Sequence, residues 1–234
     1  MVKIIVELRI CTNIEKTHLF NNNLIENNNK RIQQYRKGIL KFIELNKKYI
    51  NNQDIDVYIT DNTIQDNQTL SKHLLDIIPN NFKIITCFNN NYGCYNKGAG
   101  DIEQWLYCKK IIEEYDYFIH FEPRQLLIDN QFIDNFMKNP RTIFTYGSGK
   151  NHFNTGLFAC KTQELLQFIN IFSPKLLVEK HLGIEYAIYH FYNNKIPYDI
   201  LDKMNLIWYP SNTNSLVDEF KINANGRLPE NFQS

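Results

Sequence analysis

The sequence predicts a single α/β domain with a mostly parallel central sheet and helices on both faces. Segments with strand character alternate with segments of helical periodicity along the first half of the chain, the order of a β-α-β-α-β-α-β fold. The strand segments are apolar at nearly every position, as strands covered on both faces must be. Polar loops follow the strands, at the edge where open parallel sheets bind their ligands.

Length and composition restrict the function further. The chain has 234 residues, which one large core accommodates. Its 26 basic and 25 acidic residues nearly cancel, which argues against nucleic acid or an anionic membrane as partner. The five scattered cysteines lack a CxxC pair and are typical of free thiols in a reducing compartment. No signal-peptide pattern and no apolar run of membrane-spanning length is present, so we expect a soluble, cytoplasmic protein without a transmembrane segment.

The expected elements follow one another without a repeat. Strands are predicted at residues 2–10, 56–60, 82–87, 116–121, 142–146, 154–159 and 206–209. Helices are predicted at residues 31–49, 70–78, 102–115, 163–171 and 182–192, with Asp101 as the N-cap of the third. The Asn-rich segment 11–30 is expected to be a loop over the ligand cleft, and residues 211–234 a polar C-terminal tail.

The most informative stretch is NYGCYNKGAGD at residues 91–101, between the third strand and the third helix. Gly93, Gly98 and Gly100 allow close backbone approach, and the first N–H groups of a helix attract anions. Phosphate or sugar hydroxyls would bind there. A tight turn before a well-capped helix explains the same pattern, so both interpretations stay open.

This stretch resembles a segment of the GT-A glycosyltransferases, in which an Asn-x-Gly…Asn-x-Gly pattern precedes the strand that carries Asp-x-Asp. The resemblance implies a GT-A-like domain over residues 1–210, with residues 1–124 binding a nucleotide-sugar and residues 140–210 forming the acceptor side. It also implies that Asn96, Gly98 and Asp101 contact the donor sugar and that Lys97 contacts the pyrophosphate.

The position of Asp-x-Asp is altered, because this sequence has Glu122-Pro123-Arg124 there. Two schemes follow. His120 and Glu122 face the same side of a strand and would hold Mn²⁺ or Mg²⁺ as an altered motif. Alternatively, no cofactor is required, and Arg124 acts as a catalytic residue that stabilises the departing phosphates as a forked donor. We favour the second, metal-independent scheme.

The same resemblance assigns five further residues. Asp61 and Arg9, at the ends of the first two strands, are candidate contacts of the nucleoside. Asn154 and Gly156, in the sequence HFNTGLF, resemble the Phe-Asn-x-Gly segment that faces donor and acceptor. Glu185, near the start of the last predicted helix, is the candidate base that deprotonates the acceptor hydroxyl.

The sequence therefore predicts a glycosyltransferase that moves a sugar from a nucleotide-sugar, with a UDP-sugar favoured, to a hydroxyl of a glycan or related acceptor. A catalytically inactive GT-A-like protein that binds glycans or nucleotides remains an alternative, because the metal motif is altered. A sugar-phosphate nucleotidyltransferase is a second alternative. It needs a glycine-rich loop after the first strand, and residues 11–30 contain no glycine.

Overall fold

A computed structural model describes residues 2–13, 25–65, 70–147, 150–193, 196–202, 206–208 and 220–221, with only the backbone described for 25–28, 207–208 and 220–221. Within these residues the strands form a seven-stranded sheet in the order β3-β2-β1-β4-β7-β6-β8 and a three-stranded sheet in the order β10-β9-β5. The pairs β1–β2, β1–β4, β2–β3 and β6–β8 are parallel. The predicted α/β fold with a mostly parallel sheet is confirmed.

The first half of the chain builds the parallel part of the large sheet. Its strands are β1 (Ile4–Arg9), β2 (Asp56–Asp61), β3 (Lys83–Thr86) and β4 (Tyr117–Phe121), all close to their predicted ranges. The helices between them are α1 (Ile25–Asn51), α2 (Lys72–Leu75), α3 (Lys97–Tyr107) and α4 (Lys109–Ile112). Every residue of β1 is buried, which explains why all of its residues except Glu7 and Arg9 are apolar.

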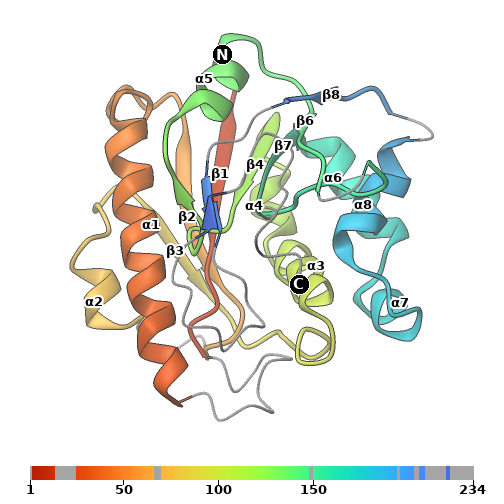
Figure 1. The fold of residues 1–234 in the computed structure, drawn as a ribbon, viewed down its shortest axis with the longest axis horizontal. Coiled ribbons are helices and arrows are strands. Elements are labelled where there is room, and N and C mark those ends of the chain that lie inside the picture. Colours follow the sequence, from red (N-terminus) through yellow and green to blue (C-terminus); the bar gives the residue numbers. More distant parts are fainter. Residues whose placement is uncertain are drawn as a thin grey trace.

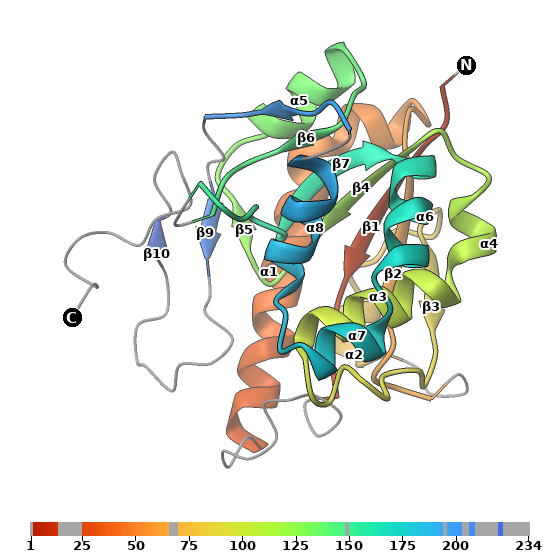
Figure 2. The same cartoon turned by 90° about the vertical axis from the view of Figure 1, so that its right-hand side faces the viewer.

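Helices cover both faces of the large sheet (Figure 1). On one face α1 and α2 pack on a cluster that includes Ile39, Phe42 and Leu74. On the other, α3 packs with α6 (Thr162–Ile171), α7 (Pro174–Glu179) and α8 (Ile184–Asn193), as Figure 2 also shows. The two clusters share the sheet as a common wall, so the strand ends form an edge between two helical layers.

The second half of the chain departs from a purely parallel sheet. Strand β7 (Leu157–Lys161) is antiparallel to both β4 and β6 (Ile143–Phe144), and β8 (Asp199–Ile200) extends the edge. Strand β9 (Leu206–Trp208) forms close to the predicted strand at residues 206–209. It does not join the large sheet but pairs with β5 (Leu126–Leu127) and β10 (Phe220–Lys221) in the small one. Strand β10 lies in the segment expected to be a polar tail. Helix α5 (Gln131–Lys138) follows β5 and was not predicted.

Two predicted boundaries are wrong for a common reason. Helix α1 begins at Ile25, inside the segment expected to be a loop, and residues 14–24 of that segment lie outside the described residues. Helix α3 begins at Lys97 rather than at residue 102. Asparagine and glycine have low helix propensity, so an Asn-rich and a Gly-rich first turn conceal the start of each helix. Helix α2 is shorter than predicted and ends at Leu75.

No helix among the described residues combines the length and the apolar character that crossing a bilayer requires.

Candidate functional site

The candidate site lies where β1 and β4 end, next to the first turn of α3. From β1 the chain continues through α1 on one face to β2, whereas α3 lies on the other face and leads into β4. The connections therefore leave these neighbouring strands toward opposite faces. In open α/β sheets this switch point is where ligands bind, beyond the carboxyl ends of the strands.

The first turn of α3 is fixed by Asn96, which was predicted as a donor contact. Its side-chain oxygen accepts a hydrogen bond from the N–H of Ala99 at 3.3 Å, so Asn96 is the N-cap. The prediction that Asp101 caps this helix is wrong, because Asp101 lies inside it. The Asn96 amide also donates to the carbonyl of Leu182 at 3.0 Å. The cap thus joins α3 to the turn that precedes α8.

Gly98 lets α3 and α8 approach closely. A Cβ atom at Gly98 would lie 2.5 Å from the Cβ of Ile184, the first residue of α8. The predicted donor loop and the predicted acceptor helix therefore touch at their N-terminal turns. In front of α3, the Glu103 carboxylate accepts hydrogen bonds from the N–H groups of Tyr92 and Gly93 at about 3.0 Å, which holds the glycine-containing turn in place.

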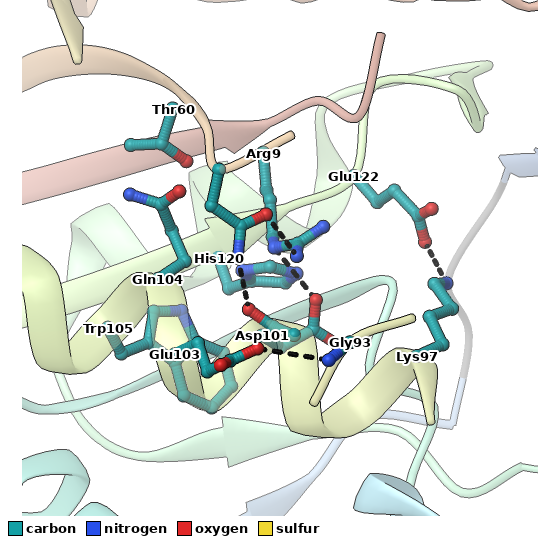
Figure 3. Close-up of polar contacts among 12 residues, drawn as sticks. Arg9, Thr60, Gly93, Lys97, Asp101, Glu103, Gln104, Trp105, His120 and Glu122 are labelled. Atoms are coloured by element: carbon teal, nitrogen blue, oxygen red, sulfur yellow. Dashed lines mark hydrogen bonds and ion pairs between the residues drawn. The ribbon is translucent and has the colours of Figure 1, made fainter. Parts of the chain in front are cut away.

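Arg9 and Asp101, two predicted donor contacts, form a buried ion pair (Figure 3). The Nε atom of Arg9 lies 2.8 Å from Oδ1 of Asp101. The Nη2 atom of Arg9 donates to the side-chain oxygen of Asn62 at 3.2 Å. Burial raises the pKa of the Asp101 carboxyl, although the charge of Arg9 acts to lower it. Strand β1, the turn after β2 and helix α3 meet at this pair.

Glu122 and Lys97 form a second ion pair at the same edge, visible to one side of the Arg9–Asp101 pair in Figure 3. The Lys97 ammonium donates to Oε2 of Glu122 at 2.8 Å, and Nε of Arg124 lies 3.6 Å from Oε1. Burial acts to raise the pKa of Glu122, but the charges of Lys97 and Arg124 outweigh it and hold that pKa well below the ordinary value. Glu122 is therefore a carboxylate held between two cations.

His120 points into the domain rather than toward Glu122. Its Nδ1 atom lies 2.8 Å from Oε2 of Glu7, and its ring stacks on Phe158 with centroids 5.2 Å apart. Both oxygens of Glu122 face cations instead. Among the described residues, no group of three or more His, Cys, Asp or Glu side chains is placed to hold a metal ion. His120 and Glu122 thus do not fit a divalent cation in this arrangement.

Glu7 is a buried carboxylate that the sequence reasoning did not single out. Besides His120, it accepts hydrogen bonds from Nε1 of Trp105 and from the Thr60 hydroxyl, both at 2.8 Å. Burial acts to raise the pKa of Glu7, but the hydrogen bond and charge of His120 hold it below the ordinary value. The signal that could have identified it is a glutamate between Val6 and Leu8 in a strand whose residues are all buried, because a buried glutamate requires hydrogen-bond or charge partners.

Asp61, a predicted nucleoside contact, has both oxygens occupied by protein groups. Oδ2 accepts hydrogen bonds from the Thr12 N–H and hydroxyl at 2.9 and 2.5 Å, and Oδ1 accepts from the Thr63 N–H and hydroxyl at 2.8 and 2.6 Å. Asp61 is almost fully buried. In this structure it joins the end of β2 to the chain that leaves β1.

The predicted acceptor-side residues lie on the segment that reaches the same edge. The Gly156 carbonyl accepts a hydrogen bond from the Glu122 N–H at 2.9 Å, and the Gly156 N–H donates to the Asn154 side chain at 3.0 Å. Glu185 is half-buried in the first turn of α8, and its carbonyl accepts from the Phe153 N–H at 3.4 Å. The backbone thus places Asn154, Gly156 and Glu185 along one side of the site.

Arg31 is a buried cation of the site that the sequence reasoning missed. It lies on α1, and its Nε atom donates to the carbonyl of Cys11, just beyond β1, at 2.9 Å. Its charge is among the causes of the lowered pKa of Glu122. The available signal was its spacing from Tyr35 and Gly38, because residues i, i+4 and i+7 share a helix face.

Comparison with known proteins gives similarities of structure only. No model of a known protein family matches the sequence, and no curated protein sequence matches it. One similar solved structure is a protein named as a nucleotide-diphospho-sugar transferase from Desulfovibrio desulfuricans G20, with 10% sequence identity and a TM-score of 0.46 over 86% of this chain and 81% of that one. Another is the apo-form glycosyltransferase GlyE of Streptococcus pneumoniae TIGR4, with 10% identity and a TM-score of 0.42 over 86% of this chain. This chain covers 45% of that protein.

Proposed function

We propose that this protein is a glycosyltransferase that moves a sugar from a nucleotide-sugar, with a UDP-sugar favoured, to a hydroxyl of a glycan or related acceptor. One observation supports it above all. Lys97, Asp101, Glu122 and Arg124 meet at the switch point of the sheet, where an α/β fold binds nucleotides. A cation in the first turn of a helix, as Lys97 is, suits a nucleoside diphosphate, because the N-terminal N–H groups add to its field.

In the proposed reaction each group has a separate task. Lys97 and Arg124 neutralise the charge that develops on the departing diphosphate, which is the step where electrostatic stabilisation contributes most. Asp101, oriented by Arg9, accepts hydrogen bonds from hydroxyls of the donor sugar. Glu185 removes the proton from the attacking hydroxyl of the acceptor. The scheme requires no metal ion, since His120 and Glu122 are engaged with protein groups.

A second candidate is a protein that binds a nucleotide or glycan without turnover. The contacts that favour it are those of Glu122 with Lys97 and Arg124, because the two cations that would stabilise the departing diphosphate already face a carboxylate of the protein. Ligand binding and turnover must therefore be measured separately.

Thermal unfolding in the presence of nucleotides and nucleotide-sugars tests binding. We expect a UDP-sugar at a concentration well above its Kd to raise Tm, because a ligand that binds only the folded state stabilises it by mass action. The rise is expected to be the same with Mn²⁺ and with EDTA. A rise in Tm that depends on Mn²⁺ would contradict the metal-independent scheme. If none of the nucleotides or nucleotide-sugars raised Tm, the transferase proposal would be contradicted.

Turnover of the stabilising donor tests catalysis. We expect Glu185→Gln to retain donor binding and to lose about 10²- to 10⁴-fold in kcat, the usual contribution of a general base. Glu179→Gln is the matched control, because Glu179 is an exposed glutamate on the neighbouring helix α7. Equal rates for the two variants would remove Glu185 from the mechanism. Donor binding without any turnover would support the non-catalytic candidate.

A further inference from the structure

Helix α1 presents a polar stripe to the strand end that carries Glu122. Arg31, Tyr35 and Gly38 recur at i, i+4 and i+7 and share one face. A Cβ atom at Gly38 would lie 1.7 Å from the carbonyl oxygen of Pro123, so this face packs directly on the segment that contains Arg124. The Nε atom of Arg31 donates to the Cys11 carbonyl at 2.9 Å, just beyond the end of β1, the strand that pairs with β4. The charge of Arg31 acts on the pKa of both Glu122 and Arg124.

The positive charge in this region exceeds the negative charge. Lys97, which is partly exposed, and the buried Arg124 lie beside the Glu122 carboxylate, and the charge of the buried Arg31 also acts on it. The nearest other acids have partners of their own among the described residues: Asp101 pairs with Arg9, and the threonines around Asp61 occupy its oxygens. Folded proteins normally compensate their buried charges. Within the part of the chain that the structure describes, these three cations share one carboxylate, Glu122, which leaves two positive charges without a counterion there.

Two hydrogen-bond donors in the same region also lack an acceptor among the described residues. They are the Nε atom of Arg124 and the hydroxyl of Tyr35, and both are buried. Burial lowers the pKa of Arg124, and the neighbouring charge of Arg31 lowers it further, against the opposing effect of Glu122. Unsatisfied buried donors are costly, and two of them beside uncompensated cations indicate an anion with several acceptor oxygens.

We propose that Arg31, Arg124 and Lys97 form a receptor for the diphosphate of the donor and that Glu122 is an internal anion that occupies this receptor until the ligand displaces it. The inference rests on the proposed function and adds two points to it. Arg31 becomes a further binding residue, and the Glu122 carboxylate competes with the diphosphate for the three cations. The incoming diphosphate supplies the missing negative charge and the acceptors for Arg124 and Tyr35. The Glu122 carboxylate leaves its cations at the same time, because like charges in one site repel each other.

Calorimetric titration with inorganic pyrophosphate, in EDTA and at low ionic strength, tests the receptor without nucleoside or sugar. We expect the unmodified protein to bind pyrophosphate and Glu122→Gln to bind it about tenfold more tightly or better, because the competing charge is gone. Arg31→Gln is expected to weaken binding about tenfold or more, since a charged hydrogen-bond donor is lost. Arg36→Gln on the same helix is the matched control and is expected to bind as the unmodified protein does, because Arg36 donates to the carbonyl of His73 instead.

The proposal is overturned if Glu122→Gln binds pyrophosphate no more tightly than the unmodified protein, or if Arg31→Gln and Arg36→Gln bind alike. If Glu122→Gln does not fold, Glu122→Asp takes its place, and the shorter carboxylate is expected to compete less and to tighten binding. Failure of this inference differs from failure of the proposed function. Pyrophosphate binding with these changes but without a response to any nucleotide-sugar contradicts the transferase alone, and donor turnover with unchanged pyrophosphate affinities contradicts the receptor alone.

Discussion

The acidic residues of the site differ chiefly in their partners. Asp61 is surrounded by hydroxyl and N–H donors, Asp101 pairs with one arginine, and Glu122 lies between a lysine and an arginine. The sequence identified Asp61 and Glu122 because each stands at a strand end, and Asp101 because it ends the glycine-containing stretch before the third predicted helix. It could not predict which groups pair with them, since Thr12 follows β1 whereas Asp61 ends β2, and only the folded topology brings the two together.

The four hydrogen bonds to Asp61 predict a structural effect of its removal. Asp61→Ala leaves the N–H groups of Thr12 and Thr63 buried without an acceptor, and we expect a loss of about 2–4 kcal/mol in the free energy of unfolding. Chemical denaturation measures it. Asp76→Ala, at an exposed position just after α2, is the control and is expected to change stability by less than about 0.5 kcal/mol. If Asp61→Ala lowered the free energy of unfolding by no more than Asp76→Ala does, these hydrogen bonds would contribute little to stability.

The lowered pKa of Glu122 predicts how stability depends on pH. Because its pKa is lower in the folded state than the value of 4.5 for a free glutamate, the unfolded chain binds the proton more readily. The stabilisation is complete well above pH 4.5 and is lost as the pH falls from there toward the folded pKa. We therefore expect the stability difference between the unmodified protein and Glu122→Gln to be larger at pH 7 than at pH 3. Denaturant unfolding at both pH values measures it, and a difference that does not change with pH would contradict the assignment.

At the scale of elements, local propensity predicted the long elements well and their first turns poorly. The strands β1, β2 and β4 were recognisable because burial on both faces requires apolar residues nearly throughout. The start of α3 was not recognisable. Asn96 is an N-cap whose helix opens with Lys-Gly-Ala-Gly, and packing against α8 stabilises that turn despite its low propensity. The short helices and two-residue strands lack any period that a sequence reveals.

The contact between α1 and the strand end predicts an unusual effect at Gly38. In the middle of a helix, glycine to alanine normally stabilises by about 0.5–1 kcal/mol. Here the new methyl group would lie 1.7 Å from the Pro123 carbonyl oxygen, a backbone atom that cannot rotate away. We expect Gly38→Ala to destabilise the protein by about 1–3 kcal/mol or more, measured by thermal or chemical unfolding.

Gly183→Ala provides the comparison for that experiment. A Cβ atom there would meet the Oε2 atom of Glu185 at 3.0 Å, the far end of a flexible side chain. We expect this substitution to change stability by less than about 1 kcal/mol. If Gly38→Ala stabilised the protein instead, α1 would not pack on the segment that carries Arg124, and the stripe of Arg31 and Tyr35 would not face Glu122.

At the scale of the molecule, the order of the elements predicted the fold class but not the whole topology. Four alternating strands and helices lead to a parallel sheet because crossovers of one hand pack back on it. Nothing local determines that β7 runs antiparallel beside β4, or that β5, β9 and β10 leave the large sheet for a small one. Those pairings join strands that lie far apart in the sequence, such as β5 and β9. The site was predictable only in part for the same reason.

The buried side chain of Glu7 links the large sheet to helix α3, and this predicts how much its removal destabilises the protein. Its partners are Thr60 on β2, His120 on β4 and Trp105 on α3, so one carboxylate joins three strands and a helix. Glu7→Leu removes the acceptor for all of them, and we expect a loss of about 3–5 kcal/mol in unfolding free energy, because the remaining groups stay buried and unpaired.

A double-mutant cycle separates this network from simple packing. We expect Glu7→Leu with His120→Phe to cost less than the two single losses combined, by about 1–3 kcal/mol, since removing both members of a buried pair leaves fewer unpaired groups. The control cycle combines Glu7→Leu with Tyr49→Phe, whose hydroxyl binds Asp134 and shares no partner with Glu7. Its losses are expected to add within about 0.5 kcal/mol. Additive losses in both cycles would mean that His120 is held by its ring contacts with Phe158 and Trp105 rather than by Glu7, because those contacts survive the loss of the carboxylate.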